Sequence, residues 1–296
     1  QDIRWAAWSR VGGGAQVQGW NWKLSTGLKS HDRSFDEWGR LTSYPLGPYS
    51  RTLDYDEADR IKAYTHTQAG SPVSALDQSF SYDGAGRLTR AQVGAKIWTY
   101  AYDATGNRKT HSSPTLGSGT DEIASTSNRL TSSTAPSLSF TYASTGDAKI
   151  GTWTAIYSLG DHIATIKWGT TTTAYEYDGE QRRVLKSNPG GRTSYVYGAQ
   201  GELLGEYNQA TGEAIREYVW LGSTPVAMIT TPARSTTAEL FLLHADHIDT
   251  PRIATDLQGR TRWTWLAEPF GNESPDETPS GLSYVTNNLR FPGQQF

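Results

Sequence analysis

The sequence predicts an all-β protein in which β-hairpins join edge to edge into a curved, spiralling sheet. The pattern Tyr-Asp-x-x-Gly, with an Arg one or two residues after the glycine, recurs along the chain, most clearly at residues 82–89 and 102–108 and less completely at 35–42, 55–61 and 177–184. Residues that favour pleated strands flank each copy. The chain is only 36% hydrophobic but rich in Tyr and Trp, which suits a single sheet wetted on much of both faces.

Each copy of the pattern has the chemistry of a tight hairpin turn. Asp83 and Asp103 occupy the first turn position, where a carboxylate accepts a backbone N–H two residues later. Gly86 and Gly106 follow three residues on and supply a residue with positive φ that closes the turn. These four residues are therefore predicted to be structural turn residues.

The spacing of the turns supports a repeat. Several steps are about 20 residues, the length of two short strands and a turn. Repeats of this kind stack so that each mainly contacts its neighbours. The glycine position is predicted at Gly39, Asp59, Gly86, Gly106, Ser127, Gly146, Gln181 and Gly201.

Arginine outnumbers lysine by 19 to 8, partly because an Arg follows the turn glycine in the repeat. A guanidinium can stack on a Tyr ring and also pair with a carboxylate. The arginines are therefore predicted to form a structural ladder along the repeats. The net charge of −3 provides no basic field for nucleic acid.

A second group of motifs follows the repeats. The segments are 244–252, 255–259, 263–265, 269–271 and 288–294. Together with the Tyr-Asp repeats, this ordered set resembles the Rhs/YD-repeat proteins of bacteria over roughly residues 30 to 296. The residues matched to the core signature of that family are His244, Asp246, His247, Thr250, Pro251, Arg252, Asp256, Gly259, Pro269, Phe270 and Gly271.

The resemblance implies a hollow β-shell that encloses a toxic C-terminal domain and then cleaves itself. It implies a secreted or cell-surface bacterial protein whose partners are flanking shell segments, further chains of the same assembly and the encapsulated toxin. The self-cleaving aspartates of the family lie near a DPxG-type motif, and this sequence stops before one. We therefore expect a structural, non-enzymatic segment, excised from a longer chain, that needs no cofactor.

Three regions are expected along the chain. Residues 1–30 are an irregular start of the repeat region, 31–239 the hairpin array, and 240–296 the core-signature segment, truncated before the cleavage motif. Clustered Pro, Gly, Ser and Thr predict loops at 114–120 and 230–237.

The sequence offers several catalytic and metal-binding alternatives. If His244, Asp246 and His247 lay on a strand, the first two would face one side and the third the other, so a zinc site would need a further ligand. Hydrogen bonding at a turn is the favoured role. Asp249-Thr250 lacks the second carboxylate of a proteolytic dyad. No Gly-x-Ser-x-Gly elbow or phosphate-binding loop occurs, although a Ser-His-Asp triad stays open.

The absence of cysteine excludes disulfides, thiolate catalysis and Cys-based zinc sites. No apolar run approaches the roughly 18 residues of a membrane-spanning helix. The function predicted is a scaffold segment of a shell that encapsulates or delivers a toxin. The alternative is a surface module that binds glycans or a partner protein through exposed aromatic side chains, Trp included.

Overall fold

The computed structural model describes residues 3–11, 14–24, 27–143, 148–158, 162–232, 235–266, 269–271, 273–292 and 294, with side chains from residue 17 onward. Within these ranges the chain is built from β-strands, with one short 3-10 turn at Ser74–Leu76 and no α-helix. The first strands are β1 (Ile3–Val11), β2 (Gly14–Leu24), β3 (Gly27–Asp32), β4 (Ser34–Phe35), β5 (Leu41–Leu46), β6 (Tyr49–Tyr55), β7 (Ile61–Gln68), β8 (Ser71–Pro72), β9 (Gln78–Tyr82) and β10 (Leu88–Val93).

The middle strands are β11 (Lys96–Tyr102), β12 (Arg108–Ser113), β13 (Gly117–Ile123), β14 (Leu130–Thr134), β15 (Ser137–Tyr142), β16 (Ala148–Ile150), β17 (Trp153–Tyr157), β18 (Ile163–Trp168), β19 (Thr171–Tyr177), β20 (Arg183–Asn188), β21 (Gly191–Tyr197) and β22 (Leu203–Asn208). The last strands are β23 (Ala214–Leu221), β24 (Thr224–Thr230), β25 (Glu239–Ala245), β26 (Pro251–Thr255) and β27 (Thr261–Thr264).

Most consecutive strands pair antiparallel, although β3 and β4 lie in different sheets. A register shift accompanies the repeat turns. In β11 and β12, Ala101 pairs with Thr110, but the next residue, Tyr102, pairs with Arg108. The same one-residue shift occurs at Tyr55, Tyr177 and Tyr197. A bulge of this kind bends a strand and strengthens its twist. The Tyr-Asp pattern therefore sets both the turn and the local bend of each hairpin.

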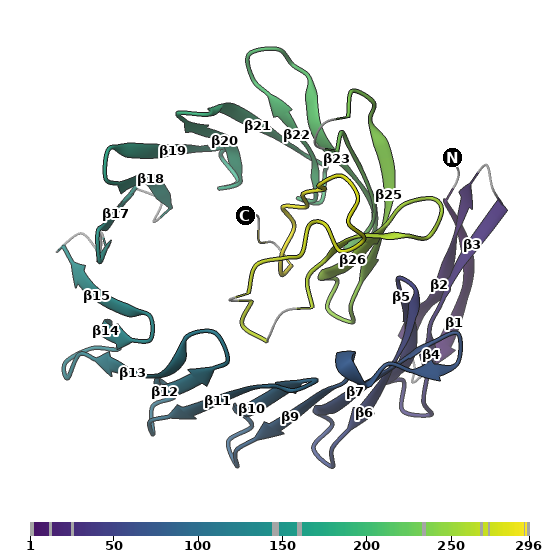
Figure 1. Ribbon diagram of the computed structural model, residues 1–296, viewed down its shortest axis with the longest axis horizontal. Coiled ribbons are helices and arrows are strands. Elements are labelled where there is room, and N and C mark those ends of the chain that lie inside the picture. The colour runs from purple at the N-terminus through teal and green to yellow at the C-terminus, as the bar shows by residue number, and fades with distance from the viewer. Residues whose placement is uncertain are drawn as a thin grey trace. The chain divides into compact units, whose positions relative to one another are not determined.

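The chain divides into two compact units. The second unit, Tyr82–Arg90 with Lys96–Glu217, contains the hairpins from β11 to β22, which follow one another as a curved ribbon coloured from blue through teal to green (Figure 1). None of the largest fully buried side chains of the described residues lies in this unit. A single sheet with partly exposed side chains therefore forms it, as the low hydrophobic content predicts.

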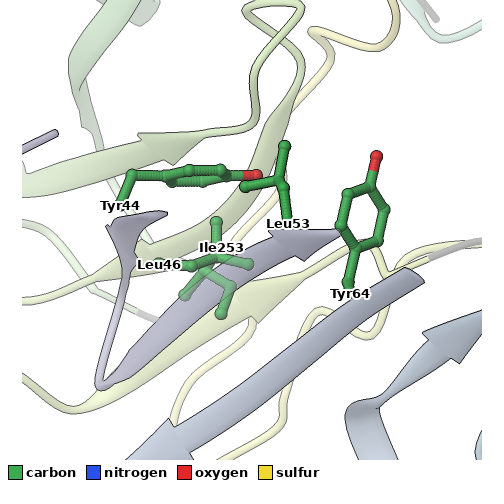
Figure 2. Packing of buried hydrophobic residues seen from close by; sticks show 5 residues of the cluster. All are labelled: Tyr44, Leu46, Leu53, Tyr64 and Ile253. Carbon is green, nitrogen blue, oxygen red and sulfur yellow. The ribbon is translucent and has the colours of Figure 1, made fainter. Parts of the chain in front are cut away.

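The first unit, Gln1–Ser81 with Ala91–Ala95 and Tyr218–Phe296, contains the large buried side chains. Its β5, β6 and β7 contribute Tyr44, Leu46, Leu53 and Tyr64 to a cluster that also holds Ile253 of β26. Figure 2 shows these five side chains gathered between the two sets of strands. Segments about 200 residues apart in sequence thus share one core, in which each buried aliphatic side chain contributes roughly 1.5–3 kcal/mol.

A second cluster of the first unit anchors its N-terminal strands. Strands β1, β2 and β3 form a separate three-stranded sheet. Trp20 and Trp22 of β2 are buried against Val226 of β24 and Leu242 of β25. The indole N–H of Trp22 donates to the Val226 carbonyl oxygen, 3.1 Å away. This sheet is therefore held to the rest of the unit by its indole rings.

The hairpin fold predicted from the sequence is confirmed, and so is the positive φ of Gly86 (79°) and Gly106 (93°). Asp59 and Gln181 take the same conformation at the glycine position, as expected. Ser127 does not, so that assignment is wrong: the Ala124 N–H donates to the carbonyl oxygen of Arg129, one residue further than in the other turns. Gly146 lies outside the described residues.

The prediction of a loop over residues 114–120 is also wrong for residues 117–120, because β13 begins at Gly117. Thr120 donates its backbone N–H to the Thr134 hydroxyl on the next hairpin. Small polar residues indicate a loop only when no neighbouring strand satisfies their backbone groups. Hairpin strands also occur after residue 239, at β26 and β27.

The turn at Asp83 offers an internal test of the backbone argument. Gly86 has a φ of 79°, whereas Gly84, in the same turn, has no positive φ and no atom within 4 Å of the place that a Cβ would occupy. We predict that Gly86→Ala lowers the free energy of unfolding by about 1–2 kcal/mol through backbone strain. Gly84→Ala should change it by less than about 0.5 kcal/mol. Equal effects in urea unfolding would contradict the prediction.

Candidate functional site

The repeat turn is the most regular side-chain arrangement in the molecule. At Asp83, one carboxylate oxygen accepts the backbone N–H groups of Ala85 (3.0 Å) and Arg87 (2.9 Å). The other oxygen accepts the Nε–H of Arg87 at 2.7 Å. The Asp83 N–H donates to the Arg87 carbonyl oxygen, and the Gly86 N–H donates to the Asp83 carbonyl oxygen. The turn is therefore fully hydrogen-bonded without help from another strand.

The same carboxylate geometry recurs in both units. Asn107 replaces Arg in the turn of Asp103, and Arg252 lies six residues after Asp246 rather than four. The aspartates that share the arrangement are Asp36, Asp56, Asp103, Asp178, Asp246 and Asp256.

In one turn, the carboxylate that binds the backbone comes from the end of the turn instead of from its first residue. Gly198 stands where the others have Asp, and the Glu202 carboxylate, four residues later, accepts the N–H of Gln200 at 3.0 Å. A Cβ at residue 198 would lie 2.1 Å from a Glu202 oxygen. The carboxylate therefore fills the space that an Asp side chain takes elsewhere, which explains a glycine that needs no positive φ.

Hydrogen bonding keeps the turn carboxylates charged. The side-chain hydrogen bonds from Asn107 and Thr105 lower the pKa of Asp103 to about 2. The Arg60 side chain, with the backbone N–H groups of the turn, lowers the pKa of Asp56. These bonds act on the charged form and so favour it. The turns therefore remain intact at neutral pH and weaken only in strong acid.

Several turn arginines also contact the next repeat. The Arg87 guanidinium lies over the Tyr102 ring, 4.9 Å from its centroid, and donates to the Asp103 carbonyl oxygen at 2.8 Å. The Tyr102 hydroxyl donates back to the Leu88 carbonyl oxygen at 2.8 Å. We name this set the inter-repeat latch: a turn Arg or its substitute, the carbonyl of the residue that follows it, and the Tyr that ends a strand just before the next turn.

The latch recurs with little variation. The ring of His162 replaces the guanidinium in one copy, with its centroid 4.8 Å from that of Tyr177. Because the Tyr ring covers the preceding turn and its hydroxyl binds that repeat's backbone, each latch connects two hairpins beyond their strand pairing. The other copies join Arg40 and the Leu41 carbonyl to Tyr55, Arg129 and the Leu130 carbonyl to Tyr142, the Ile163 carbonyl to Tyr177, and Arg182 and the Arg183 carbonyl to Tyr197.

The core-signature residues include two further repeat turns that the sequence analysis did not recognise as such. Asp246 and Asp256 are the turn aspartates, with Asp249 (φ 63°) and Gly259 (φ 82°) at the glycine position. The signal was present in the sequence: Asp256-x-x-Gly259-Arg260 fits the repeat pattern. Thr250 is fully buried in the first of these turns and donates its N–H to Asp246.

Arg252, which follows Pro251 at the start of β26, joins this turn to the C-terminal segment. Its Nε–H donates to Asp246 at 2.7 Å, and its guanidinium lies 5.3 Å from the Trp265 ring centroid and 5.6 Å from that of Phe291. A Cβ on Gly271 (φ 74°) would lie 2.7 Å from the Phe291 ring. Trp265 thus takes the place of a latch Tyr.

Pro269 and Phe270 precede Gly271 in a turn. Phe270 is exposed, and Pro269 is half-buried. The structure therefore brings Arg252 and Gly271 together around Trp265, but it leaves the Phe270 side chain largely in solvent. The roles of Arg252, Pro269, Phe270 and Gly271 as core-signature residues stay predictions.

The two histidines of the signature have different surroundings. His244 is buried in β25, and its Nε2 lies 3.0 Å from the Thr255 hydroxyl. Burial and the nearby Lys29 lower the pKa of His244 to about 3, so the ring is neutral at pH 7. His247 is exposed, and its Nδ1 lies 3.5 Å from the Tyr64 hydroxyl.

The strand alternation assumed for these residues is wrong. β25 ends at Ala245, so Asp246 and His247 belong to the turn. Asp246 ends the strand because its carboxylate hydrogen-bonds the following backbone instead. Across the described residues, no group of three or more His, Cys, Asp or Glu side chains is placed to hold a metal ion.

A buried polar network in the first unit had no counterpart in the sequence analysis. The Arg51 Nε–H donates to His66 Nε2 at 2.9 Å, so His66 carries its proton on Nδ1, which lies 3.3 Å from Asp77 Oδ1. Arg51 also donates to the Tyr44 hydroxyl and lies over the Tyr64 ring, 4.5 Å from its centroid. Burial and Arg51 lower the pKa of His66 to about 4. The pairing of β6 with β7 places Arg51 opposite His66.

Exposed Trp side chains do occur. Trp153 and Trp168 face each other across β17 and β18, with ring planes 3° apart and centroids 5.1 Å apart. They are 43% and 57% exposed. Such a pair stabilises a hairpin, and each ring keeps one free face. The glycan-binding alternative stays a prediction.

In the residues that the structure describes, turn carboxylates, Arg side chains and Tyr rings bind one another and connect neighbouring hairpins. Across the described residues, no helix is long and apolar enough to cross a membrane. The arrangement defines a class of protein, a scaffold of laterally latched β-hairpins.

Comparison with known proteins places the chain within that class. The family model described as teneurin YD-shell matches residues 49–282, and the chain belongs to this family. It is thereby a member of the Rhs/YD-repeat proteins. No curated protein matches the chain.

Solved structures with similar folds are complexes of TcdB2 with TccC3. The complex without its hypervariable C-terminal region superposes with a TM-score of 0.60 at 14% identity, over 97% of this chain and 17% of that one. The TcdB2-TccC3-Cdc42 complex gives 0.56 at 15% identity, over 86% and 16%. TcdB2-TccC3 gives 0.55 at 15% identity, over 89% and 16%. The chain thus spans about a sixth of these structures, and the likeness shows the fold alone.

The latch can be tested with a conservative substitution. We predict that Arg87→Lys lowers the free energy of unfolding by about 1–3 kcal/mol, because an ammonium cannot bind Asp83, stack on Tyr102 and reach the Asp103 carbonyl together. Arg192 is a matched control: it is exposed and lies 3.8 Å from Glu176. Arg192→Lys should cost at most about 0.5 kcal/mol. Equal costs in denaturant unfolding would show that the latch adds no stability.

The His66 network predicts acid sensitivity. His66 binds a proton near pH 6.5 when unfolded but only near pH 4 when folded, so stability is lost as the pH falls through this window. Between pH 7 and pH 4, the wild type should lose on the order of 2–3 kcal/mol more than His66→Gln, whose amide oxygen can still accept from Arg51. Urea unfolding at the two pH values measures the difference. Parallel pH profiles for the two proteins would refute the assignment.

Proposed function

We propose that this chain forms part of the wall of an Rhs-type shell that encloses and delivers a toxic C-terminal domain. The observation that carries the proposal is the single-layer hairpin ribbon of the second unit, in which latches join the repeats at Arg87, Arg129, His162 and Arg182. A globular binding domain would bury a core between two layers. A wall of one layer needs strong contacts between neighbouring hairpins, and the latch provides them.

The comparisons support this proposal at the level of fold. The family is a YD-shell family, and the similar solved structure is described as lacking a hypervariable C-terminal region. A constant wall followed by a variable segment is the arrangement expected of a container with exchangeable cargo. The partners proposed are flanking shell segments or further chains of the same assembly and an enclosed toxin, with no role for nucleic acid.

The proposal assigns the chain no enzymatic role. The buried Glu206 and Arg216 side chains pair with each other at 2.8 Å. A secreted or cell-surface location in bacteria, and a part in competition between them, complete the proposal. The Arg and Tyr of the latch remain paired at the neutral pH of an external medium.

The test uses the natural reading frame that contains this chain, expressed whole. We expect the segment downstream of the shell to resist added protease and to be harmless while enclosed. Combined Arg87→Lys and Arg182→Lys changes should weaken two latches and raise the rate of downstream cleavage by about tenfold or more. The control is Arg192→Lys, which should protect as well as the wild type does.

Two outcomes would refute the proposal. One is a downstream segment that is cleaved as fast in the whole protein as in isolation. The other is a protected segment that has no toxicity when it is expressed alone. Far-UV circular dichroism of each variant confirms that the shell segment itself stays folded.

A further inference from the structure

Two buried histidines lie at the contact that attaches the N-terminal three-stranded sheet to β24 and β25. His31, on β3, is stacked on Trp20, with ring centroids 3.8 Å apart and planes 11° apart. It also meets the Trp22 ring edge-on, at a centroid distance of 6.0 Å. His244, on β25, meets the same Trp22 ring at 5.6 Å. The Trp22 ring therefore contacts one histidine from the sheet and one from the strand that the sheet packs against.

The surroundings of both histidines favour the neutral ring. Both side chains are almost completely buried. In the part of the chain that the structure describes, no protein group hydrogen-bonds either ring nitrogen of His31 or the Nδ1 of His244. The His244 Nε2 lies 3.0 Å from the Thr255 hydroxyl. A neutral imidazole is tolerated in such a site, whereas an imidazolium would be a buried charge without a counter-ion.

The cations at this contact come from the N-terminal segment. Arg33, just after β3, lies over the Trp20 ring, 5.0 Å from its centroid. Lys29, on β3 itself, is half-buried. The charged and titratable neighbours of the two rings, over all the elements packed against them, are Arg33, Lys29, Tyr44 of β5, and Asp249 and Asp256 of the turns that flank β26. Asp249 interacts with Arg33, and Asp256 interacts with Lys29.

Burial and these cations together keep both rings neutral. Burial is the largest cause that lowers the pKa of His31 well below its usual value, and the charges of Arg33 and His244 lower it further. Burial and Lys29 lower the pKa of His244 to about 3. Once exposed to water, each ring would regain its ordinary pKa of about 6.5 and would bind a proton in mild acid.

We propose that the N-terminal three-stranded sheet is released from β24 and β25 by acid, when His31 and His244 take up protons. Release breaks the hydrogen bond from the Trp22 indole to the Val226 carbonyl oxygen and exposes the apolar side chains of the contact. The inference concerns the first unit alone and does not depend on enclosure of a toxin.

The direction of the pH dependence follows from the proton count. The attached sheet binds fewer protons than the released one, because both histidines are neutral only while they are buried. Attachment therefore has its full strength above about pH 6.5 and weakens as the pH falls below that value. Between pH 6 and pH 5, each histidine shifts the equilibrium toward release by about eightfold, and the two together by about 60-fold.

The test uses thiol labelling, because the chain contains no cysteine. Val226→Cys places one thiol in the buried contact on β24. Its rate of reaction with dithiodipyridine is divided by that of Ala104→Cys, at an exposed turn of the second unit, to remove the pH dependence of the thiol itself. We expect the corrected rate to rise by about 60-fold from pH 6 to pH 5.

Histidine variants made in the Val226→Cys chain assign the protons. His31→Phe keeps a ring stacked on Trp20 and should reduce the rise to about eightfold. His244→Gln should do the same, and the corrected rate of the double variant should not change with pH. The control is His66→Gln, which alters the separate network of Arg51 and should keep the full rise.

A second reporter distinguishes release of the sheet from unfolding of the whole unit. Ala91→Cys is buried elsewhere in the first unit and should react at least about tenfold more slowly than Val226→Cys at pH 5. If Val226→Cys fails to fold, Ala227→Cys, which lies beside Trp22 on the same strand, takes its place. Equal rates at the two positions, or a full rise in the double histidine variant, overturn the proposal.

Discussion

The structure depends on the hydrogen-bonded turn built by one aspartate. Its carboxylate binds two backbone N–H groups and an Arg side chain that lie within a few residues, so the turn forms from local sequence alone. The carboxylate also fixes the direction of that Arg. Because the guanidinium is held on one side by Asp83, its other side is presented to Tyr102 of the next repeat. A local interaction is thereby converted into a contact between hairpins.

This conversion helps to explain how the second unit is held together. Trp98, Tyr100 and Tyr195 are buried in it, but none of the largest fully buried side chains of the described residues lies there. A sheet with few large buried side chains gains less hydrophobic stabilisation than a layered domain. The latch of Arg87 adds a charge-assisted hydrogen bond, a guanidinium stacked on an aromatic ring, and a tyrosine hydroxyl bound to a carbonyl. Each contribution is modest, about 0.5–1.5 kcal/mol, but the pattern recurs along the ribbon. Stability in such an array is close to a sum over repeats and their neighbours.

The first unit is stabilised mainly by buried hydrophobic clusters. Its three-stranded sheet is attached through Trp20 and Trp22, and β26 is attached through Ile253. Its buried histidines, His66 and His244, are kept neutral, which makes this unit the acid-sensitive part of the chain.

Sequence alone determined the hairpin repeat, the turn residues Asp83, Gly86, Asp103 and Gly106, and the Arg ladder, because these depend on neighbours within five residues or on the next repeat. It treated Asp246 and Asp256 as a separate signature although each builds a repeat turn. Thr250-Pro251 and the flanking His residues obscure the pattern at Asp246, whereas Asp256-x-x-Gly259-Arg260 fits it. Only the tertiary structure decided which residues share a core.

The pairs Arg51 with His66 and Trp22 with Val226 lie 15 and 204 residues apart. No local preference links them. Their contact depends on strand register and on which distant strands of the first unit pack together. These are properties of packing, in which the free energy comes from excluding water between distant segments, and a pattern along the chain does not encode which segments those are.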